Sequence, residues 1–155
     1  MNKNYANYFQ LTLKLQAELS KGRRFMHQMI QTDKAPQAIG PYSQAIFADD
    51  LLFVSGQIPI NPLTEKLVSD EIKIQTKQVL DNIEAILIAA GFTLEDVVKT
   101  EVYMKDLAEF TQMNELYSER FCFKIKPARQ AMQVVKLPLD ARIEISCIAK
   151  KNSKS

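Results

Sequence analysis

The sequence predicts an α+β fold in which two helices pack on one face of a mixed β-sheet. Strand and helix signals alternate along the chain in the order strand, strand, helix, strand, helix, strand, strand. Such an alternation suits helices that cover one side of a sheet. The chain has 155 residues, which fit one domain because a single hydrophobic core commonly closes at about 100 to 150 residues.

A β-hairpin is predicted near the start of this domain. Residues 42–48 lead through Asp49-Asp50 into the apolar residues 51–55, and an acidic pair between two apolar stretches is typical of a hairpin turn. Pro59 ends the second strand because proline cannot donate a hydrogen bond to a sheet. The loop that follows has room for a short extra strand at residues 66–68.

Two helices are predicted from the spacing of apolar residues. The first is expected between an N-cap at Ser69 or Asp70 and Gly91, which lies just beyond its end. Asp106, with Glu109 three residues later, resembles a capping box and predicts the start of the second helix. The apolar residues at helical spacing are Ile72, Val79, Ile83, Ile86 and Ala90 in the first helix, and Phe110, Met113, Tyr117 and Phe121 in the second.

Three further strands are predicted at residues 97–104, 129–136 and 142–149. A short proline-containing connection, residues 137–140, separates the last two strands, so we expect them to pair as a hairpin. The residues of the last strand alternate between two faces, with Ile143, Ile145, Cys147 and Ala149 on one and Glu144, Ser146 and Ile148 on the other.

Residues 1–28 differ in composition from residues 29–151, which form the predicted domain. They contain five basic side chains and one acidic one, whereas residues 29–155 contain 15 basic and 17 acidic side chains, a net charge of −2. Three interpretations of this extension are open: a poorly ordered tail or upstream start with initiation at Met26 or Met29, an accessory helix, and an organelle transit peptide. A secretory signal is disfavoured because polar residues interrupt the apolar stretch, so we expect a cytoplasmic protein.

Composition disfavours several kinds of chemistry. No apolar run approaches the roughly 20 residues that cross a bilayer. Cys122 and Cys147 lack metal-ligand spacing, His27 is the single histidine, and the chain has no glycine-rich phosphate loop. The slightly acidic domain also lacks the basic face that nucleic acids require. We therefore expect no metal, no organic cofactor, no nucleic-acid partner and no membrane.

Arg129 and Glu144 are the charged residues most suited to chemistry. Arg129 follows Pro127-Ala128 at the start of a strand, where an exposed strand-end arginine is the alternative interpretation. Glu144 lies between two isoleucines and is either a partly buried acid or base or part of a solvated sheet face. In the predicted hairpin Glu144 lies opposite Val134 or nearby, which leaves Arg129 roughly 16 Å away along the strand. Either a bulge or loop curls Arg129 back or the site combines residues of two subunits, and the second arrangement is favoured.

Two turns provide weaker candidates. Gly40-Pro41 precedes Tyr42, whose side chain either lines a site or simply packs. Ser55-Gly56 ends a strand where a glycine allows the backbone to approach a ligand, unless it is only a strand end.

Taken together, these segments resemble the RidA (YjgF-type) family of imine and enamine deaminases over roughly residues 29–150. The matching segments, in chain order, are Ala35-Pro36, Ile39 to Ala45, Ser55 to Pro59, Leu80 to Ile83, Ala89 to Gly91, Val98 to Thr100, Lys105 to Leu107, Pro127 to Arg129, Leu137-Pro138 and Ile143 to Ile145. The resemblance implies a chorismate-mutase-like α+β fold, a homotrimer with three clefts between its subunits, and hydrolysis of 2-imino acids to 2-oxo acids and ammonia.

The resemblance also implies roles for particular residues. Arg129 would hold the substrate carboxylate, Glu144 would position or activate water, and Tyr42 would line the cleft with its hydroxyl. The residues that correspond to further substrate-binding positions of the family are Asn114, Ser55, Gly56 and Ala131.

The chain departs from many members of that family at three positions. Gln130 and Ala131 stand where a small hydroxyl residue and often a cysteine occur, and Ser146 stands where a second glutamate occurs. Gln130 leaves the substrate preference open. The expected substrates are 2-iminobutanoate and 2-iminopropanoate, and the alternative functions are a regulator that senses 2-oxo acids without turnover and an RNA-acting translation inhibitor.

Overall fold

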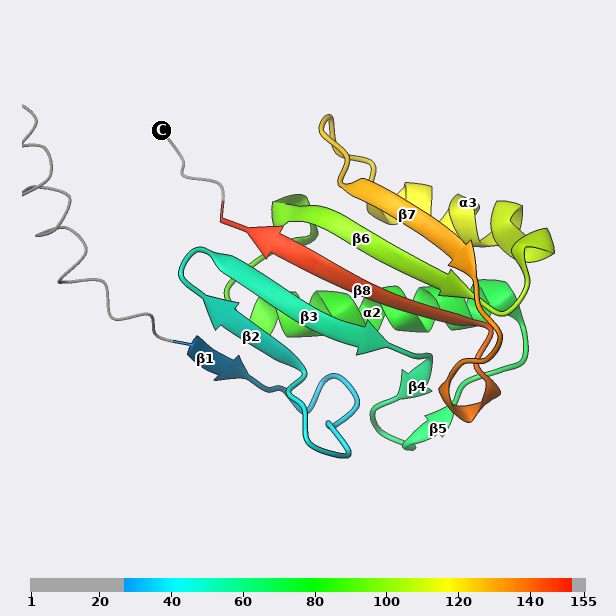
Figure 1. Cartoon of the computed structure of the whole chain (residues 1–155), viewed down its shortest axis with the longest axis horizontal. Helices are drawn as coiled ribbons and strands as arrows, with labels where there is room; N and C mark the ends of the chain where they lie inside the picture. The colour runs from blue at the N-terminus through cyan, green and yellow to red at the C-terminus, as the bar shows by residue number, and fades with distance from the viewer. Residues whose placement is uncertain (1–26, 152–155) are drawn as a thin grey trace, which may run out of the picture.

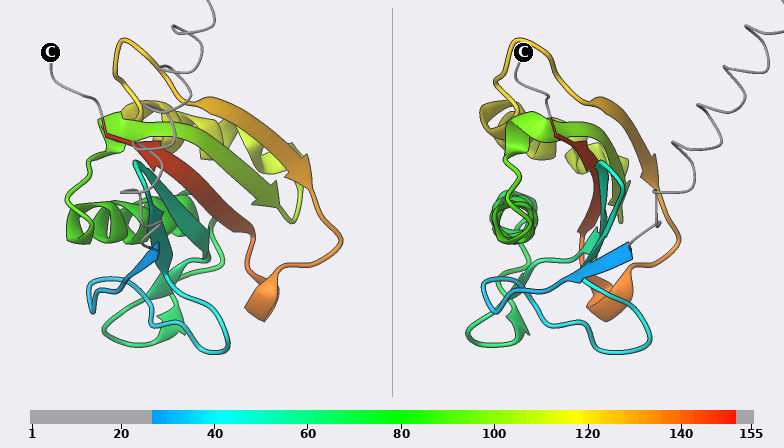
Figure 2. Two further views of the ribbon diagram at one scale, coloured as in Figure 1. Left: turned by 60° about the vertical axis from the view of Figure 1, so that its left-hand side comes forward. Right: turned by 90° about the vertical axis from the view of Figure 1, so that its left-hand side faces the viewer.

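The computed structural model describes residues 27–151, which form a six-stranded sheet with two α-helices on one of its faces (Figure 1, Figure 2). The strands of this sheet are β1 (His27–Ile30), β2 (Ala45–Ala48), β3 (Leu51–Gln57), β6 (Val97–Met104), β7 (Ala128–Gln133) and β8 (Ile143–Lys150). The helices are α2 (Ile72–Ala89) and α3 (Phe110–Arg120), and β4 (Ile60–Asn61) pairs with β5 (Lys66–Leu67) in a small separate ribbon. Short 3-10 turns are η1 (Leu94–Asp96), η2 (Leu107–Glu109) and η3 (Pro138–Asp140). The predicted fold class, a mixed sheet with two helices on one face, is confirmed.

The last strand of the chain lies in the middle of the sheet. The strand order is β1-β2-β3-β8-β6-β7, and β8 runs antiparallel to both of its neighbours. The predicted hairpin between the last two strands is therefore wrong, because β7 pairs with β6 in parallel. A parallel pair needs a long crossover connection, which α3 supplies between β6 and β7. Residues 134–142 then carry the chain back past β6 to the centre.

One face of the sheet is apolar and covered by the helices. In β8 the apolar residues and the polar residues face opposite sides as predicted, with Ile143, Ile145, Cys147 and Ala149 buried. Helix α2 packs toward the sheet and toward α3. Its residues with almost no exposed surface are Val79, Leu80, Ile83, Ile86 and Leu87. Burial of a Leu or Ile side chain stabilises a fold by about 1.5–3 kcal/mol, so this layer provides the main driving force for folding.

The ends of both helices differ slightly from the prediction. The N-cap of α2 is Glu71 rather than Ser69 or Asp70, although the Ser69 hydroxyl accepts a hydrogen bond from the Glu71 N–H at 3.2 Å. Gly91 follows the helix with φ 76°, a left-handed conformation that glycine adopts without strain. The Asp106 carboxylate caps η2 by accepting the Ala108 N–H at 2.9 Å, so the second predicted helix begins with a 3-10 turn.

Strand β1 was not predicted. It pairs with β2 from His27 opposite Ala48 to Ile30 opposite Ala45, and the Ile30 side chain is buried. His27 and Gln28, which belong to the predicted extension 1–28, are thus part of the sheet. Residues 1–26 lie outside the described residues, so the interpretations of the extension stay predictions.

Candidate functional site

The predicted site residues fall into two groups on different sides of the sheet. Arg129, Ala131 and Asn114, which we call the edge group, lie at β7 and α3 on the helix-covered face. Tyr42, Ser55, Gly56 and Glu144, which we call the bulge group, lie around the end of β3 and on the uncovered face.

Arg129 is oriented by α3. It pairs in register with Thr100, whose buried hydroxyl shares a hydrogen bond of 2.7 Å with the Tyr117 hydroxyl, so the arginine side chain faces the helix. Its guanidinium lies 4.5 Å from the centroid of the Tyr117 ring and 5.4 Å from that of Phe110. Nη1 donates to Asn114 Oδ1 at 2.8 Å. The aromatic ring and the amide hold the cation in place, and because Arg129 is exposed its other N–H groups can receive a carboxylate.

Ala131 can contact a ligand through its backbone. Its side chain packs against the core. Val134 N–H bonds to the Met104 carbonyl at 2.9 Å, and because backbone groups alternate in direction along a strand, the Ala131 N–H points to the free edge of β7. The predicted substrate contact at this position therefore needs no particular side chain.

A β-bulge shapes the second group. Val54 pairs with Cys147 and Gln57 with Ile145, so three steps along β3 match two along β8. The extra residue bends the strand end at Ser55-Gly56, which is a common use of bulges near functional sites. The Ser55 hydroxyl donates to the Ser43 carbonyl at 2.7 Å and thereby ties the bulge to the loop before β2.

Glu144 lies directly over the bulge glycine. A Cβ atom on Gly56 would stand 1.9 Å from Glu144 Oε1, so only glycine leaves room for this carboxylate. Glu144 is partly buried, and burial raises the pKa of its carboxyl. No residue in the range 27–151 makes a hydrogen bond or ion pair with that carboxylate. A carboxyl that is partly desolvated and unpaired takes up a proton more readily than a solvated one, so it is suited to accepting and returning a proton.

Glu101 lies on the same face of the sheet as Glu144, but its carboxylate is paired with a lysine and its pKa is shifted in the opposite direction. Lys99 Nζ lies 2.8 Å from its Oε1, and the hydroxyls of Tyr103 and Ser146 each donate to Oε2 at 3.2 Å. These contacts, that of Lys99 foremost, lower the pKa of Glu101. Two neighbouring carboxylates with pKa values pushed apart are a pattern found in acid–base sites.

A cavity of about 310 Å³ adjoins the bulge group. Tyr42 and Gly56 both line it, and the Tyr42 side chain is 55% exposed. The wall on the Tyr42 side is held by the buried amide of Gln44, which the sequence did not single out. Gln44 Oε1 accepts the Thr32 N–H at 2.7 Å, and its Nε2 donates to the Pro36 carbonyl at 2.7 Å. A lone amide before an apolar strand is the signal that could have indicated this role.

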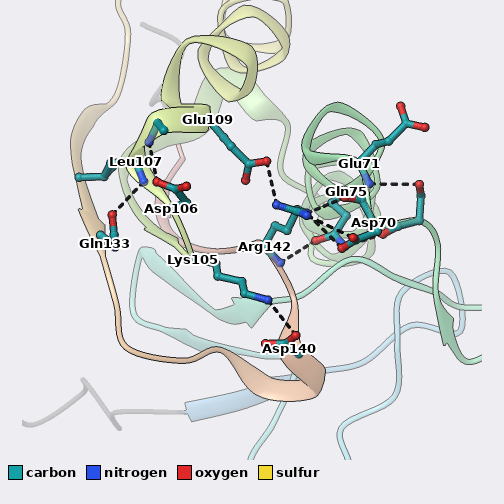
Figure 3. Close-up of polar contacts among 12 residues, drawn as sticks. Asp70, Glu71, Gln75, Lys105, Asp106, Leu107, Glu109, Gln133, Asp140 and Arg142 are labelled. Carbon is teal, nitrogen blue, oxygen red and sulfur yellow. Dashed lines mark hydrogen bonds and ion pairs between the residues drawn. The ribbon is translucent and has the colours of Figure 1, made fainter.

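Arg142 forms a second polar cluster that sequence reasoning missed (Figure 3). Its Nη1 donates to Glu109 at 2.8 Å, and its Nε donates to the Asp70 backbone carbonyl at 2.5 Å. The hydrogen bond from Arg142 lowers the pKa of the Asp70 carboxyl. Because Arg142 precedes β8, these contacts fix the strand that carries Glu144 against the start of α2 and against η2.

Arg129 and Glu144 do not meet within one chain. On β6 their register partners are Thr100 and Tyr103, so Glu144 lies opposite Tyr103 and not near Val134 as predicted. The backbones of Arg129 and Glu144 are therefore offset by three residues along the strand direction and by two strand spacings across the sheet, which together give roughly 14 Å. Their side chains point to opposite faces of the sheet. The β3 bulge lies beside Glu144 and does not curl Arg129 toward it.

The described part of the chain shows no group of three or more His, Cys, Asp or Glu side chains that could hold a metal ion. Among residues 27–151, no helix has both the length and the apolar character needed to cross a membrane.

The described residues thus form a two-layer α+β domain with an arginine on the edge strand and a glutamate over a bulge glycine. A family model described as Endoribonuclease L-PSP matches residues 32–151. The chain is 55% identical to a RutC family protein of Pyrococcus horikoshii, over 81% of this chain and 99% of that protein. It is 48% identical to the chloroplastic Reactive Intermediate Deaminase A of Arabidopsis thaliana, over 79% of this chain and 65% of that protein.

Solved structures give the same assignment. The Rid family protein YyfA of Yersinia pestis superposes with a TM-score of 0.80 at 45% identity, over 81% of this chain and 100% of that chain. E. coli TdcF with bound serine superposes with a TM-score of 0.77 at 37% identity, over 81% of this chain and 99% of that chain. The chain belongs to the RidA (YjgF-type, L-PSP) family.

Proposed function

We propose that this protein hydrolyses reactive 2-imino acids to 2-oxo acids and ammonia, with 2-iminobutanoate and 2-iminopropanoate as substrates. The observation that carries the proposal is the unpaired Glu144 carboxylate, whose pKa burial raises, seated over Gly56. The identity of 48% to a plant protein named Reactive Intermediate Deaminase A supports it. So does the serine bound to E. coli TdcF, because an amino acid has the carboxylate and the nitrogen of a 2-imino acid.

The chemistry needs a grip on the carboxylate and a proton acceptor for water. Arg129 offers a planar fork of N–H groups that pairs with a carboxylate through two bonds. Glu144 accepts a proton as water adds to the imine carbon, the C–O bond forms, and the π electrons move to nitrogen. Glu144 returns this proton to nitrogen and then carries the hydroxyl proton to the same nitrogen. The C–N bond breaks with its electron pair on nitrogen, ammonia leaves, and an oxygen lone pair forms the carbonyl of the 2-oxo acid. Water is the only co-reactant.

The two groups come together between subunits of a homotrimer in this proposal. Since Arg129 and Glu144 face opposite sides of one sheet, a single chain cannot place both on one small substrate. In a closed three-fold ring each subunit offers one surface to its neighbour and a different surface to the next. Each cleft then takes the bulge group from one subunit and the edge group from another.

A coupled assay tests the activity. Threonine dehydratase generates 2-iminobutanoate, and the protein should accelerate the formation of 2-oxobutanoate and ammonia above the spontaneous rate. No acceleration at any protein concentration would remove the proposal.

Mixing two inactive variants tests the shared site. Arg129→Ala keeps Glu144, and Glu144→Gln keeps Arg129. In mixed trimers formed by co-refolding, a cleft is intact where an Arg129→Ala subunit supplies Glu144 and its Glu144→Gln neighbour supplies Arg129. Random assembly restores about a quarter of the clefts if each cleft draws on two neighbours. Light scattering checks the trimer, and an inactive mixture of fully trimeric protein would show that the site lies within one chain.

The description of the matching family model as an endoribonuclease suggests a second activity, cleavage of RNA. Within residues 27–151, none of the residues that line the cavity beside Gly56 is basic, whereas RNA binding needs positive charge along the path of the RNA backbone. We therefore propose imine hydrolysis, and RNA cleavage that is lost in Glu144→Gln would contradict this choice.

A further inference from the structure

We propose that Glu101 holds the Tyr103 hydroxyl away from Glu144 and thereby keeps the Glu144 carboxylate free to accept a proton from water. Glu101 is a positioning residue in this inference, because it acts through Tyr103 and not on the substrate. The inference rests on the proposed function, in which Glu144 is the proton acceptor. The hydrogen bonds of Glu101 and the strand register around Glu144 carry it.

Neighbouring donors fill the acceptor sites of the Glu101 carboxylate. Two of them reach Oε1, the Lys99 ammonium at 2.8 Å and the Gln130 amide at 3.2 Å. The hydroxyls of Tyr103 and Ser146 each donate to Oε2 at 3.2 Å. Because a carboxylate has about four lone-pair sites, these contacts occupy Glu101 fully and hold it in one place.

The strand register brings these donors to one carboxylate. Strands β7, β6 and β8 lie side by side in the sheet (Figure 1). Gln130 on β7 and Ser146 on β8 are both register partners of Glu101 on β6. Lys99 and Tyr103 lie two residues to either side of Glu101 on its own strand, so their side chains share its face.

Tyr103 has two carboxylates within reach. Glu101 precedes it by two residues on β6, and Glu144 lies directly opposite it on β8. Side chains directly opposite in an antiparallel pair have Cβ atoms about 4.5–5.5 Å apart, and aromatic side chains reach even more distant neighbours. A phenol has one proton to donate. The hydrogen bond to Glu101 therefore leaves none for Glu144.

The Tyr103 hydroxyl keeps its proton at neutral pH. Burial, followed by the nearby carboxylate of Glu101, raises the pKa of Tyr103. The charge of Glu144 contributes to the same shift, in keeping with its position on the opposite strand. Tyr103 is thus a constant donor, and the acceptor that it bonds to decides the environment of Glu144.

Release of Tyr103 from Glu101 would change Glu144 in a defined direction. A hydrogen bond from the phenol would stabilise the charged carboxylate and lower its pKa. A carboxylate with a lower pKa takes a proton from water less readily. Burial raises the pKa of Glu144 in this structure, and no residue in the range 27–151 hydrogen-bonds to its carboxylate. The contact between Glu101 and Tyr103 preserves that state.

The other charged groups around Glu144 are committed elsewhere. Lys99 on β6 is paired with Glu101, and β3 carries no charged side chain. Arg142, just before β8, is held by the ion pairs shown in Figure 3. Arg129 on β7 faces α3. Of these charges, only that of Glu101 changes in the variants that follow.

The test separates the charge of Glu101 from its role as an acceptor. Glu101→Gln removes the charge but keeps a carbonyl that can accept the Tyr103 hydroxyl, whereas Glu101→Ala removes both. Carbon-13 NMR of the glutamate carboxyls of the full chain gives the pKa of Glu144, with Glu144→Gln to assign the signal. Glu101→Ala should lower this pKa by about half a unit or more beyond Glu101→Gln.

Removal of the donor provides the matched control. Tyr103→Phe combined with Glu101→Ala should return the pKa of Glu144 to its value in Glu101→Gln. Tyr103→Phe alone should leave that pKa nearly unchanged. If Glu101→Ala does not fold, Glu101→Val, which suits a strand, takes its place. Equal pKa values in Glu101→Ala and Glu101→Gln, or a shift that persists in the double variant, would overturn the inference.

The same shift should appear in catalysis, because the acidic limb of kcat/KM against pH reports groups of the free enzyme. With imines made in situ, that limb should move to lower pH in Glu101→Ala relative to Glu101→Gln, and should return in the double variant. An NMR shift without a kinetic one would overturn the claim that the contact serves catalysis. A wild type that accelerates no imine would contradict the proposed function, whereas the NMR titration would still decide whether Glu101 restrains Tyr103.

Discussion

The edge group and the bulge group place their charges by opposite means. Arg129 is exposed on the outermost strand, and a ring and an amide of α3 hold its guanidinium. Glu144 is partly buried on the central strand and has no ionic partner among the described residues. A cation that must capture an ion from solution benefits from exposure and fixed orientation, whereas an acid that must exchange a proton benefits from desolvation. The position of each residue in the sheet therefore determines its role: the edge strand keeps Arg129 accessible to a ligand, and the central strand keeps Glu144 partly desolvated.

The largest expected effect comes from the edge group. Arg129→Ala and Arg129→Lys should both lower turnover by about 30-fold or more, because a lost charged contact costs roughly 2 to 5 kcal/mol. Lysine keeps the charge but cannot form the two-bond fork. Steady-state kinetics with imines made in situ measure the loss, and Arg120→Lys, in the same helix layer but paired with Asp81 and Glu84, serves as the control. Near wild-type turnover of Arg129→Ala would make Arg129 a solvated strand-end residue.

The bulge group is tested by adding one methyl group. Gly56→Ala should lower turnover by about tenfold because the new Cβ displaces the Glu144 carboxylate. Gly91→Ala is the matched control, since its Cβ would meet no atom within 4 Å but its φ is 76°. That variant should lose about 1 kcal/mol of stability with unchanged turnover. If Gly56→Ala retains full activity, Glu144 does not act from the position seen here.

The pH dependence of stability should separate the two carboxylates of the uncovered face. Burial raises the pKa of Glu144 above its value in the unfolded chain, so its contribution to stability falls as pH rises through the window between the two values. Glu144→Gln should therefore raise stability relative to the wild type at about pH 8 but not at about pH 4.

Glu101→Gln should behave in the opposite way. Lys99 lowers the pKa of Glu101, so the stability that this residue adds is present above its unfolded pKa and is lost as pH falls. Urea unfolding at the two pH values gives both comparisons. Identical pH profiles for the two variants would contradict the assignment of opposite environments.

The smallest effect is expected at the N-terminus. Removal of residues 1–26 should leave turnover and Tm nearly unchanged, because the family match begins at residue 32 and β1 begins at His27. Extending the deletion through Ile30 removes β1 and a buried side chain, and should lower Tm. Loss of soluble protein on removal of residues 1–26 alone would show that the extension packs on the domain.

The sequence predicted the parts of the fold that depend on local periodicity. Alternation along β8 placed Glu144 on the face opposite the apolar residues, and helical spacing located α2 and the buried side of α3. The choice of strand partners is not local, which is why a short connection suggested a hairpin where the chain instead passes to the sheet centre. The pairing of β7 with β6 depends on α3 as the crossover, and only the tertiary structure reveals it.

Sequence reasoning found the candidate residues but not what holds them. Gln44 and Arg142 act through backbone carbonyls and distant acids that no spacing rule connects. The left-handed backbone of Leu139 was also missed, because the proline before it indicated an ordinary turn. Family resemblance assigned a ligand contact to Ser55, whereas its hydroxyl already bonds to Ser43 in this structure.

The central place of β8 has a consequence for biosynthesis. The ribosome releases β1, β2, β3, β6 and β7 before β8. In the described sheet, β8 joins the three strands β1-β2-β3 to the pair β6-β7. Until the C-terminal segment emerges, β3 and β6 each present an unpaired edge, the kind of surface that promotes aggregation. A premature stop codon near the end of the message would remove the joining strand together with Glu144. We expect such a product to be cleared by cellular quality control instead of accumulating as a partly folded domain.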